Sequence, residues 1–461
     1  MSRIAFSVAA PKASALRALN YSPFAEKFRQ HASRKVQRLR DLVDSAGASF
    51  GAVFTRVDCE VDAGVELLSQ VDVFAAEPAC RVIRRDSMPR PDNHLVRRGQ
   101  ILIAAAGQMG ESTLFGRCML ADGRLAGKYL GPDVLALTFR DEAKDAKYAY
   151  AVLGSRYGLQ LIRSAAYGTS IPRVRQDLLL DLPIPDADSA TRDRIVMLVE
   201  RAMQERERFA AELGAARAPV ELLPEMQRAH AACAARRVRV GVQSPPFRTL
   251  SAWNHVSTGA AHPLLQHAWK ARLGDVVPID GIFNGLRFGR LECAPPYGIE
   301  LLSQRDVFLL RPVPQRVSHP GFSDRKLFVP ADSLLVGGAG TLGEGEIFGR
   351  AVYVSEGMSR YAVTEHMLRV QPRPEHAPLA YAFLSTLVGR RLLRSTAVGT
   401  KILSMRPDLL RALPFPDVDE ATAAIVKQHL LEAMRARDAA DRAEAEAIRL
   451  VETEVIPEWL N

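Results

Sequence analysis

The chain has 461 residues, 48% hydrophobic and 25% charged, which excludes wholesale disorder and provides enough apolar side chains for ordinary globular cores. Its 61 Lys and Arg against 52 Asp and Glu give a net charge of +9, which favours a polyanionic partner. Five cysteines without a C-x-x-C pair exclude a paired-cysteine zinc site and argue against a secreted disulfide framework. No uncharged run reaches the roughly 18 residues of a membrane span, and Lys12 and Arg17 interrupt the N-terminal apolar stretch. We therefore expect a cytoplasmic protein without a signal peptide.

The first part of the chain predicts a β-rich body followed by helices. Short apolar runs such as Gln100–Ala105, with glycines between them, are typical of strands joined by tight turns. The stretch Lys147–Arg163 is predicted to be helical. A long helix then begins near Ser189, where apolar residues recur at helical spacing. Three residues are expected to break this helix and leave a basic second piece over 227–239, namely Gly214, Pro219 and Pro224.

The second part of the chain repeats this order. Leu334–Val336 is a strand-like run among glycines, and Pro378–Arg394 is predicted to be helical. A final helix, rich in Ala, Glu and Arg, is expected from about Glu420 to Val455. The organisation is therefore globule, helix, globule, helix.

The two halves also share sequence. The segment Gly64–Phe74 (GVELLSQVDVF) recurs as Gly298–Phe308 (GIELLSQRDVF), at an offset of 234 and with nine of eleven positions identical. Agreement at one spacing over this length indicates a tandem duplication. Further matches at offsets of 234 to 231 are Phe54, Arg56 and Cys59 with Phe288, Arg290 and Cys293; Phe115–Arg117 with Phe348–Arg350; Tyr129 with Tyr361; Gly168-Thr169 with Gly399-Thr400; and Leu182–Asp186 with Leu413–Asp417.

This layout resembles the specificity subunits of Type I restriction-modification enzymes. The resemblance covers essentially the whole chain, and four segments carry it: Gly99–Gly110 (GQILIAAAGQMG), Ser333–Gly343 (SLLVGGAGTLG), Gly168–Asp186 and Gly399–Asp417. It implies an α+β fold with two tandem β-rich target-recognition domains, each followed by a long helix, the two helices packing antiparallel as a spacer. The expected parts are a first recognition domain (1–186), a central helical spacer (187–243), a second recognition domain (244–417) and a C-terminal helical spacer (418–461).

The resemblance also implies a function without chemistry in this chain. Such a subunit binds double-stranded DNA and bridges methyltransferase (modification) subunits, here two, within a restriction-modification or methylation-based defence complex. A restriction (translocase-nuclease) subunit can join it. S-adenosylmethionine is expected in the modification subunit, so this chain binds no cofactor.

The residues support DNA recognition independently. The stretch Ser189–Leu213, if helical, spans about 37 Å at about 1.5 Å per residue, close to the roughly 34–36 Å of one turn of B-DNA. Positions that differ between the copies are where different bases would be read. The blocks 81–98 and 118–147 diverge from 314–330 and 351–374, and both pairs are rich in Arg, which suits guanine edges and phosphates. We therefore predict an asymmetric target in two parts.

Each group of candidate DNA-binding residues also has a structural interpretation. Hydroxyls and cations that follow a glycine suit phosphate contacts, but they equally suit a solvated helix N-cap. Surface arginines are commonly only solvated, and the recurrence of Arg56 and Arg290 fits a structural ion pair or a phosphate contact. Cys59 and Cys293 are interpreted as small buried hydrophobes. The candidate DNA-binding residues are Arg84, Arg85, Arg97, Arg98, Lys128, Thr169, Ser170, Arg173, Arg175, Arg287, Arg290, Arg325, Lys326, Arg360, Thr400, Lys401 and Arg406.

Catalytic patterns are weak by comparison. Gly338–Gly343 (GAGTLG) satisfies G-x-G-x-x-G, but no helix signal follows it, so a dinucleotide site is rejected. Histidines occur singly, which argues against metal ligation. The alternative that stays open is a magnesium-dependent nuclease using Asp133, Glu142 and Lys144, which loosely match P-D…E-x-K.

Overall fold

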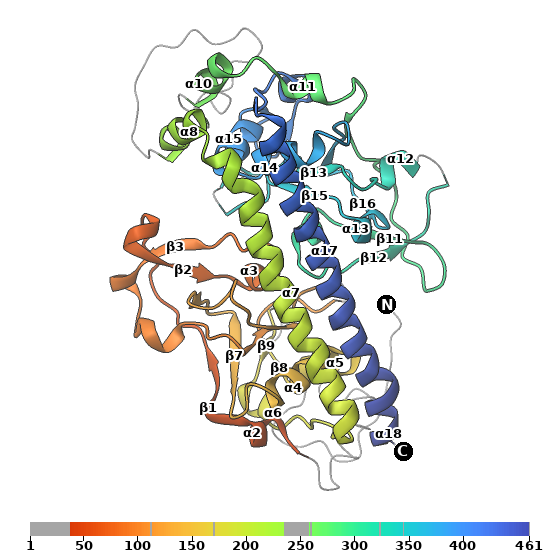
Figure 1. The fold of residues 1–461 in the computed structure, drawn as a ribbon. Helices are drawn as coiled ribbons and strands as arrows, with labels where there is room; N and C mark the ends of the chain where they lie inside the picture. The colour runs from red at the N-terminus through yellow and green to blue at the C-terminus, as the bar shows by residue number, and fades with distance from the viewer. Residues whose placement is uncertain are drawn as a thin grey trace. The chain divides into compact units, whose positions relative to one another are not determined.

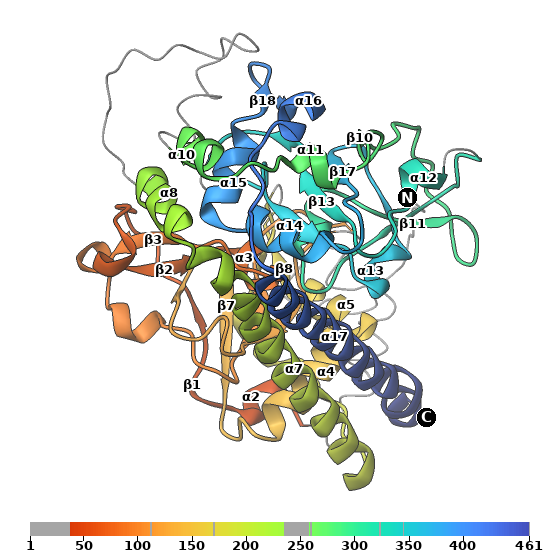
Figure 2. The ribbon, with the colours of Figure 1, turned by 45° about the horizontal axis from the view of Figure 1, so that its top comes forward.

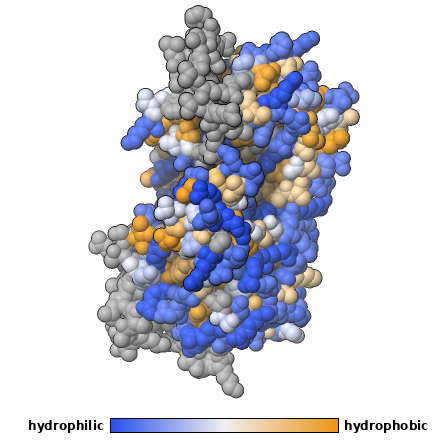
Figure 3. All heavy atoms as spheres, turned by 90° about the vertical axis from the view of Figure 1, so that its left-hand side faces the viewer, coloured by the Kyte–Doolittle hydropathy of each residue, from blue (hydrophilic) through white to orange (hydrophobic). Residues whose placement is uncertain are grey.

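The structure is a computed structural model that describes residues 37–110, 113–168, 171–234, 258, 261–321, 324–343 and 345–460. The chain divides into two units: unit 1 comprises Met1–Glu207 and Ala439–Asn461, and unit 2 comprises Arg208–Asp438. The first copy of the repeat lies in unit 1 and the second in unit 2. Among the helices described, none is long and apolar enough to cross a membrane. The face drawn in Figure 3 is largely hydrophilic, with smaller hydrophobic patches between.

Unit 1 is built on two small sheets and a hairpin (Figure 1). The central strands of the larger sheet are wholly buried, which explains their unbroken apolar sequences. The larger sheet has the order β1 (Val43–Phe50), β7 (Val134–Phe139), β4 (Ile101–Ala104), β5 (Cys118–Leu120). The smaller sheet is β3 (Arg81–Arg84), β2 (Gly64–Leu68), β6 (Tyr129–Leu130), and the hairpin is β8 (Ala166–Tyr167) with β9 (Arg173–Val174).

Unit 2 repeats the two sheets of this frame and adds a strand, β14, to the hairpin (Figures 1 and 2). Its larger sheet has the order β10 (Ile282–Asn284), β17 (Met367–Val370), β13 (Leu334–Gly337), β15 (Ala351–Tyr353). The smaller sheet is β12 (Gln315–Val317), β11 (Ile299–Leu302), β16 (Ala362–Val363), and the third is β14 (Ala339–Gly340), β19 (Leu403–Met405), β18 (Ala397–Val398). The predicted α+β class with a repeated β-rich body is confirmed.

The helices of each copy follow the same plan. Ser155 and Thr386 divide the two helical stretches that the sequence predicted as single helices. Each hydroxyl accepts a hydrogen bond from a backbone N–H three residues on, of Gly158 and Gly389, both at 3.0 Å, and so caps a new helix. The helices on either side of these caps are α4 (Asp145–Gly154) and α5 (Arg156–Ser164) in unit 1, and α14 (Ala377–Leu384) and α15 (Leu387–Arg394) in unit 2.

The remaining helices of the two units vary from single turns to the 11 residues of α8. In unit 1 they are α2 (Leu39–Leu42), α3 (Gln70–Phe74), α6 (Gln176–Leu180), η2 (Val61–Ala63), η3 (Arg85–Ser87) and η4 (Pro91–His94). In unit 2 they are α8 (Pro224–Ala234), α10 (Ala261–Ala268), α11 (Leu273–Val276), α12 (Asp324–Leu327), α13 (Glu356–Ser359), α16 (Pro407–Arg411) and η5 (Asp306–Phe308).

Two long helices follow the copies, as predicted. α7 runs over Ser189–Glu221, and α17 over Glu420–Leu450, continued by a π-helical turn (Val451–Val455) and α18 (Ile456–Leu460). The predicted break at Gly214 and Pro219 is wrong. The apolar face continues past both positions, with Ala216 and Val220 fully buried, and this packing outweighs the roughly 1 and 3 kcal/mol costs of Gly and Pro in a helix. The domain boundaries expected from the sequence stay predictions.

The strand register corrects one match of the repeat. Tyr129 pairs with Leu67 in the first copy, whereas the residue that pairs with Leu301 in the second copy is Ala362. Tyr361 is therefore displaced by one position from the equivalent of Tyr129. A shift of one residue turns a side chain to the other face of a strand, so the two tyrosines have different surroundings.

Cys59 and Cys293 are also not the buried residues that the sequence predicted. Both are half-buried. The sulfur of Cys59 packs against Gly64, the first residue of β2, and the sulfur of Cys293 packs against Gly298, the residue before β11. A Cβ atom at either glycine would collide with the sulfur. The cysteines thus fill the space that a missing side chain leaves at the edge of the small sheet.

Candidate nucleic-acid interface

An arginine from the helical part of each copy holds the glycine-rich segment. The guanidinium crosses to backbone carbonyls of that segment, and a glycine with positive φ leaves room for its stem. Arg163 donates to the carbonyls of Phe115 (3.0 Å) and Gly110 (2.8 Å), and Arg394 donates to those of Phe348 (3.0 Å) and Gly343 (2.9 Å). Neither arginine was predicted from the sequence, although Arg163-Ser164 recurs as Arg394-Ser395 at the same offset of 231 as the exit segments.

The segments after these helices form a second repeated feature, which we call the exit hairpins: β8–β9 in unit 1 and β18–β19 in unit 2. Equivalent positions pair in both, Ala166 with Val174 and Ala397 with Met405. Glycines with φ of +90° and +111°, Gly168 and the identical residue 399, open the two turns. Only a residue without a Cβ adopts this backbone at low cost, which explains the repeated glycine.

The predicted arginines at the bases of the exit hairpins are ion-paired. Arg175 and Arg406, at equivalent positions, each precede a short helix and bind the aspartate two residues on, both at 2.9 Å from Nε. This pairing raises the pKa of both guanidinium groups. Arg173 pairs with Asp133 at 2.9 Å.

The tip of the second exit hairpin is open to solvent. Thr400 and Lys401 are exposed there, and Thr400 is not the helix N-cap that was considered as an alternative. The helix begins at Pro407, with Arg406 as its N-cap. Thr169 and Ser170, at the same place in the first copy, lie outside the described residues.

The predicted basic cluster of the first copy is exposed and paired with carboxylates. Arg84 binds Asp86 at 2.6 Å, and Arg85 binds Asp92 at 2.5 Å. Arg97 is 4.0 Å from Asp44. Pairs of this kind between exposed side chains contribute about 0–1 kcal/mol, so a phosphate can replace the aspartate at little cost.

Two other predicted cations of unit 1 have a structural partner. Arg98 binds Glu207 of α7 at 2.7 Å, and the backbone N–H of Gly123 donates to the same carboxylate at 2.9 Å. Burial opposes ionisation of Glu207, but these hydrogen bonds lower the pKa of its carboxyl below the ordinary value. Lys128 is largely buried and pairs with Glu66 of β2. Both cations hold elements of unit 1 together.

Several of the predicted cations of the second copy are paired with a carboxylate or an aromatic ring. Arg290 binds Glu365 at 2.8 Å, which agrees with the ion-pair alternative for that position. Arg325 binds Asp280 at 2.6 Å and lies over the ring of Phe283. Arg360 stacks on Tyr361. Arg287 and Lys326 are exposed, and neither forms an ion pair with the residues that the structure describes.

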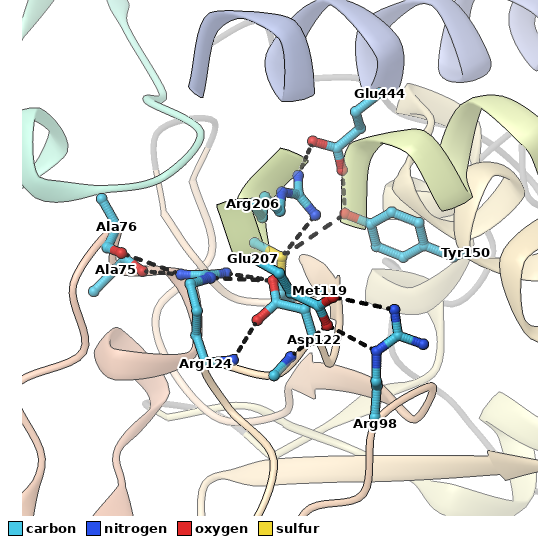
Figure 4. A network of polar contacts seen from close by, with 11 residues as sticks. Ala75, Ala76, Arg98, Met119, Asp122, Arg124, Tyr150, Arg206, Glu207 and Glu444 are labelled. Atoms are coloured by element: carbon cyan, nitrogen blue, oxygen red, sulfur yellow. Dashed lines mark hydrogen bonds and ion pairs between the residues drawn. The ribbon is translucent and has the colours of Figure 1, made fainter. Parts of the chain in front are cut away.

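A buried polar network links the long helices to the first copy within unit 1 (Figure 4). Arg206 of α7 and Glu444 of α17 form an ion pair, with side chains that are 0% and 2% exposed. The Tyr150 hydroxyl of α4 donates to the other oxygen of Glu444, and the sulfur of Met119 lies 3.4 Å from the guanidinium. Burial alone would lower the pKa of Arg206, but the carboxylate and the hydroxyl raise it above its ordinary value. Sequence periodicity did not reveal these residues.

The positions of Asp133, Glu142 and Lys144 do not fit the nuclease alternative. Asp133 precedes β7 and Glu142 follows it, so a strand of six residues, about 20 Å at roughly 3.3 Å per residue, separates them. Magnesium requires its carboxylates within about 2.1 Å of the ion. Lys144 lies 4.0 Å from Asp193 of α7. In the ranges of the chain that the structure describes, no three His, Cys, Asp or Glu side chains gather as metal ligands.

The glycine-rich pattern in the second copy also lacks the context of a dinucleotide site. Gly338–Gly343 runs through the short strand β14, and the next helix that the structure describes begins at Glu356. A pyrophosphate site of this kind needs a helix N-terminus directly after the glycines. The rejection made from the sequence therefore agrees with the fold.

Comparisons with known proteins returned solved structures only. No family model and no curated protein matches the chain. It is similar to a Type I restriction-modification system S subunit from M. genitalium, with 14% identity, a TM-score of 0.29, and coverage of 93% of this chain and 96% of that one. It is also similar to the HsdS subunit from Thermoanaerobacter tengcongensis, with 16% identity, a TM-score of 0.26, and coverage of 92% and 96%. A third structure, described by its assembly and conformational transition in the type I R-M system, has 14% identity, a TM-score of 0.26, and coverage of 91% and 98%.

Proposed function

We propose that this chain is the DNA-recognition subunit of a Type I-like restriction-modification or methylation-based defence complex. The observation that carries the proposal is one β-rich frame built twice with different exposed connections. The strand order of the larger and the smaller sheet repeats between the units, whereas the connection over 81–98 contains two 3-10 helices and its counterpart over 314–330 contains α12. A shared frame with unlike surfaces suits the reading of two unlike DNA segments.

The charge of these connections fits a polyanion. Residues 81–98 hold six Arg against two Asp, and residues 314–330 hold three Lys and Arg against one Asp. Arg84, Arg85 and Arg325 are exposed and only weakly held by neighbouring carboxylates, so they are available for phosphates or guanine edges. We therefore infer an asymmetric target in two parts, with one part read by each copy.

The long helices suit the role of a spacer and partner surface. Arg194 pairs with Glu454 and Arg206 with Glu444 in unit 1, and Arg208 pairs with Glu432 in unit 2. Glu212 of α7 also contacts His429 of α17 at 2.7 Å in unit 2, so in both units a later residue of α7 meets an earlier residue of α17 or of the π-helical turn that continues it, which supports the antiparallel spacer. The proposal places two modification subunits, which carry S-adenosylmethionine, along these helices in the cytoplasm, with a restriction subunit joining them.

Selection of DNA by the full chain tests recognition. The purified protein is incubated with a pool of random-sequence duplexes, and bound DNA is sequenced after several rounds. We expect an enriched motif with two unlike parts at a constant gap. The absence of enrichment, or a single continuous or palindromic motif, would contradict the proposal.

Substitutions assign each part to a copy. Arg84→Gln with Arg85→Gln should alter or weaken only one part of the motif, because both side chains are exposed and hold no buried contact. Arg325→Gln is the matched variant in the second copy and should affect only the other part. A variant that changes both parts alike would refute the modular reading.

Partner binding needs a surface variant rather than a truncation. Removal of the chain after Asp417 would delete Leu450, Val451 and Ile456, which lie in the core of unit 1, so the protein would lose its fold. The surface to be tested is defined by two exposed side chains of unit 1, Met197 on α7 and Arg442 on α17. We expect Met197→Ser to weaken co-purification with the modification subunit at unchanged thermal stability, and Arg442→Glu on α17 to do the same. Undiminished co-purification of both variants would count against this surface.

A further inference from the structure

The tips of the two exit hairpins carry an isoleucine that the fold does not use. Ile402 is 71% exposed, and the residue at the same position of the first copy, Ile171, is 64% exposed. The next side chain in the second hairpin, Leu403, is buried. The hairpin therefore directs one apolar residue inward and the other out.

Identity between the copies has a different meaning at an exposed position. Buried residues that recur, such as Phe115 and Phe348, are explained by the frame that both copies need. Ile171 and Ile402 are exposed and do not belong to that buried frame. Contact with solvent alone would favour a polar residue at a hairpin tip. A side chain retained in both copies without a structural role indicates a ligand feature that both copies meet.

The surroundings of the tip favour DNA over a protein surface. In the second copy the isoleucine follows Thr400 and Lys401, both exposed, and Lys401 forms no ion pair with any residue that the structure describes. The aspartates near the bases of both hairpins are already paired with arginines, as Asp408 is with Arg406. An apolar side chain beside an unpaired cation and a hydroxyl matches a groove in which phosphates flank stacked bases.

We propose that Ile171 and Ile402 are wedges that enter the minor groove and partly open a base step, one in each half of the target. This inference rests on the proposed function and adds to it the residue and mode of contact. The contact would be independent of sequence, because every base step offers an apolar stack. It would also be insensitive to salt, unlike phosphate contacts, which release counterions.

The test uses the full chain and a pool of 40-base-pair random-sequence duplexes labelled at both ends for energy transfer. Binding is measured over a series of salt concentrations for the wild type, the double variant Ile171→Ala with Ile402→Ala, and Lys401→Gln. We expect the double variant to bind at least about tenfold more weakly, with an unchanged slope of log affinity against log salt. It should also lose the change in energy transfer that a kinked duplex produces, since wedges bend DNA by about 20–90°.

The lysine variant is the matched control. Lys401→Gln should reduce the salt slope by about 0.9 and keep the change in energy transfer. Conservative replacement of both isoleucines by Val should retain most of the affinity. All variants concern exposed tips, so unchanged melting temperatures establish that any loss is not due to unfolding.

The outcomes separate this inference from the proposed function. If the double alanine variant bound and bent DNA as well as the wild type does, the wedge would be overturned and DNA recognition would stand. Loss of modification-subunit binding with intact DNA affinity in that variant would overturn it in favour of a protein contact. Failure of the wild type to bind the pool at all would refute both proposals.

Discussion

The buried ion pair between α7 and α17 allows a quantitative prediction. Glu444→Gln removes the charge that compensates Arg206 and keeps the size of the side chain. Both members are at most 2% exposed, so the cation would remain in a site without water. Breaking a buried pair by removing one partner costs about 3–5 kcal/mol. For a unit of this size, such a loss lowers the melting temperature by roughly 6–20 °C.

Two further variants isolate the cause. Replacing both members together, Arg206→Met with Glu444→Leu, should be nearly neutral or stabilising, because no unpaired charge is left behind. Arg208→Ala breaks the exposed pair with Glu432, whose side chains are 50% and 28% exposed, and should cost no more than about 1 kcal/mol.

Calorimetry and urea denaturation measure these differences on the full chain. The expected order of stability is wild type close to the double variant, then Arg208→Ala slightly lower, and Glu444→Gln clearly lowest. If Glu444→Gln and Arg208→Ala shifted the transition equally, burial of the pair would not be the decisive factor, and the reasoning would be refuted.

Three smaller predictions follow from local geometry. Gly116→Ala should destabilise by about 1–3 kcal/mol more than Gly127→Ala, because both glycines have φ near +80° but only at Gly116 would a Cβ lie 2.9 Å from the stem of Arg163; equal urea midpoints would contradict this. Burial, and then the nearby Asp72, raise the pKa of the Cys80 thiol to about 12, so at pH 8.5 the native protein should alkylate there about a thousandfold more slowly than in urea, as measured by peptide mass spectrometry; equal rates would count against burial of the thiol. The pKa of the Glu207 carboxyl is lower in the folded state, so its ionisation stabilises the fold at pH values above the unfolded pKa of about 4.3, and this stabilisation is lost as the pH falls through the folded pKa. Glu207→Gln should therefore flatten the decline of the melting temperature below a pH of about 4.5. A decline identical to that of the wild type would exclude this role.

The sequence by itself determined the duplication, the α+β class and the start of both long helices. These features depend on local patterns: identical residues at one offset, apolar runs between glycines, helical apolar spacing after Ser189, and a stretch rich in Ala, Glu and Arg after Glu420. A repeated pattern is strong information because chance does not reproduce it at a fixed distance. The missed cap at Ser155 shows the limit of periodicity, since the new helix is started by the bond from the backbone N–H of Gly158 to the serine hydroxyl.

Only the tertiary structure decided which charged residues pair and how far α7 extends. Arg98 meets Glu207 across 109 positions of sequence, and Arg206 meets Glu444 across 238. No local pattern encodes such a partner, because folding of the whole unit brings the two side chains together. The same long-range packing carries α7 past Pro219 against its intrinsic propensity, since burial of an apolar face contributes more than the backbone loses there.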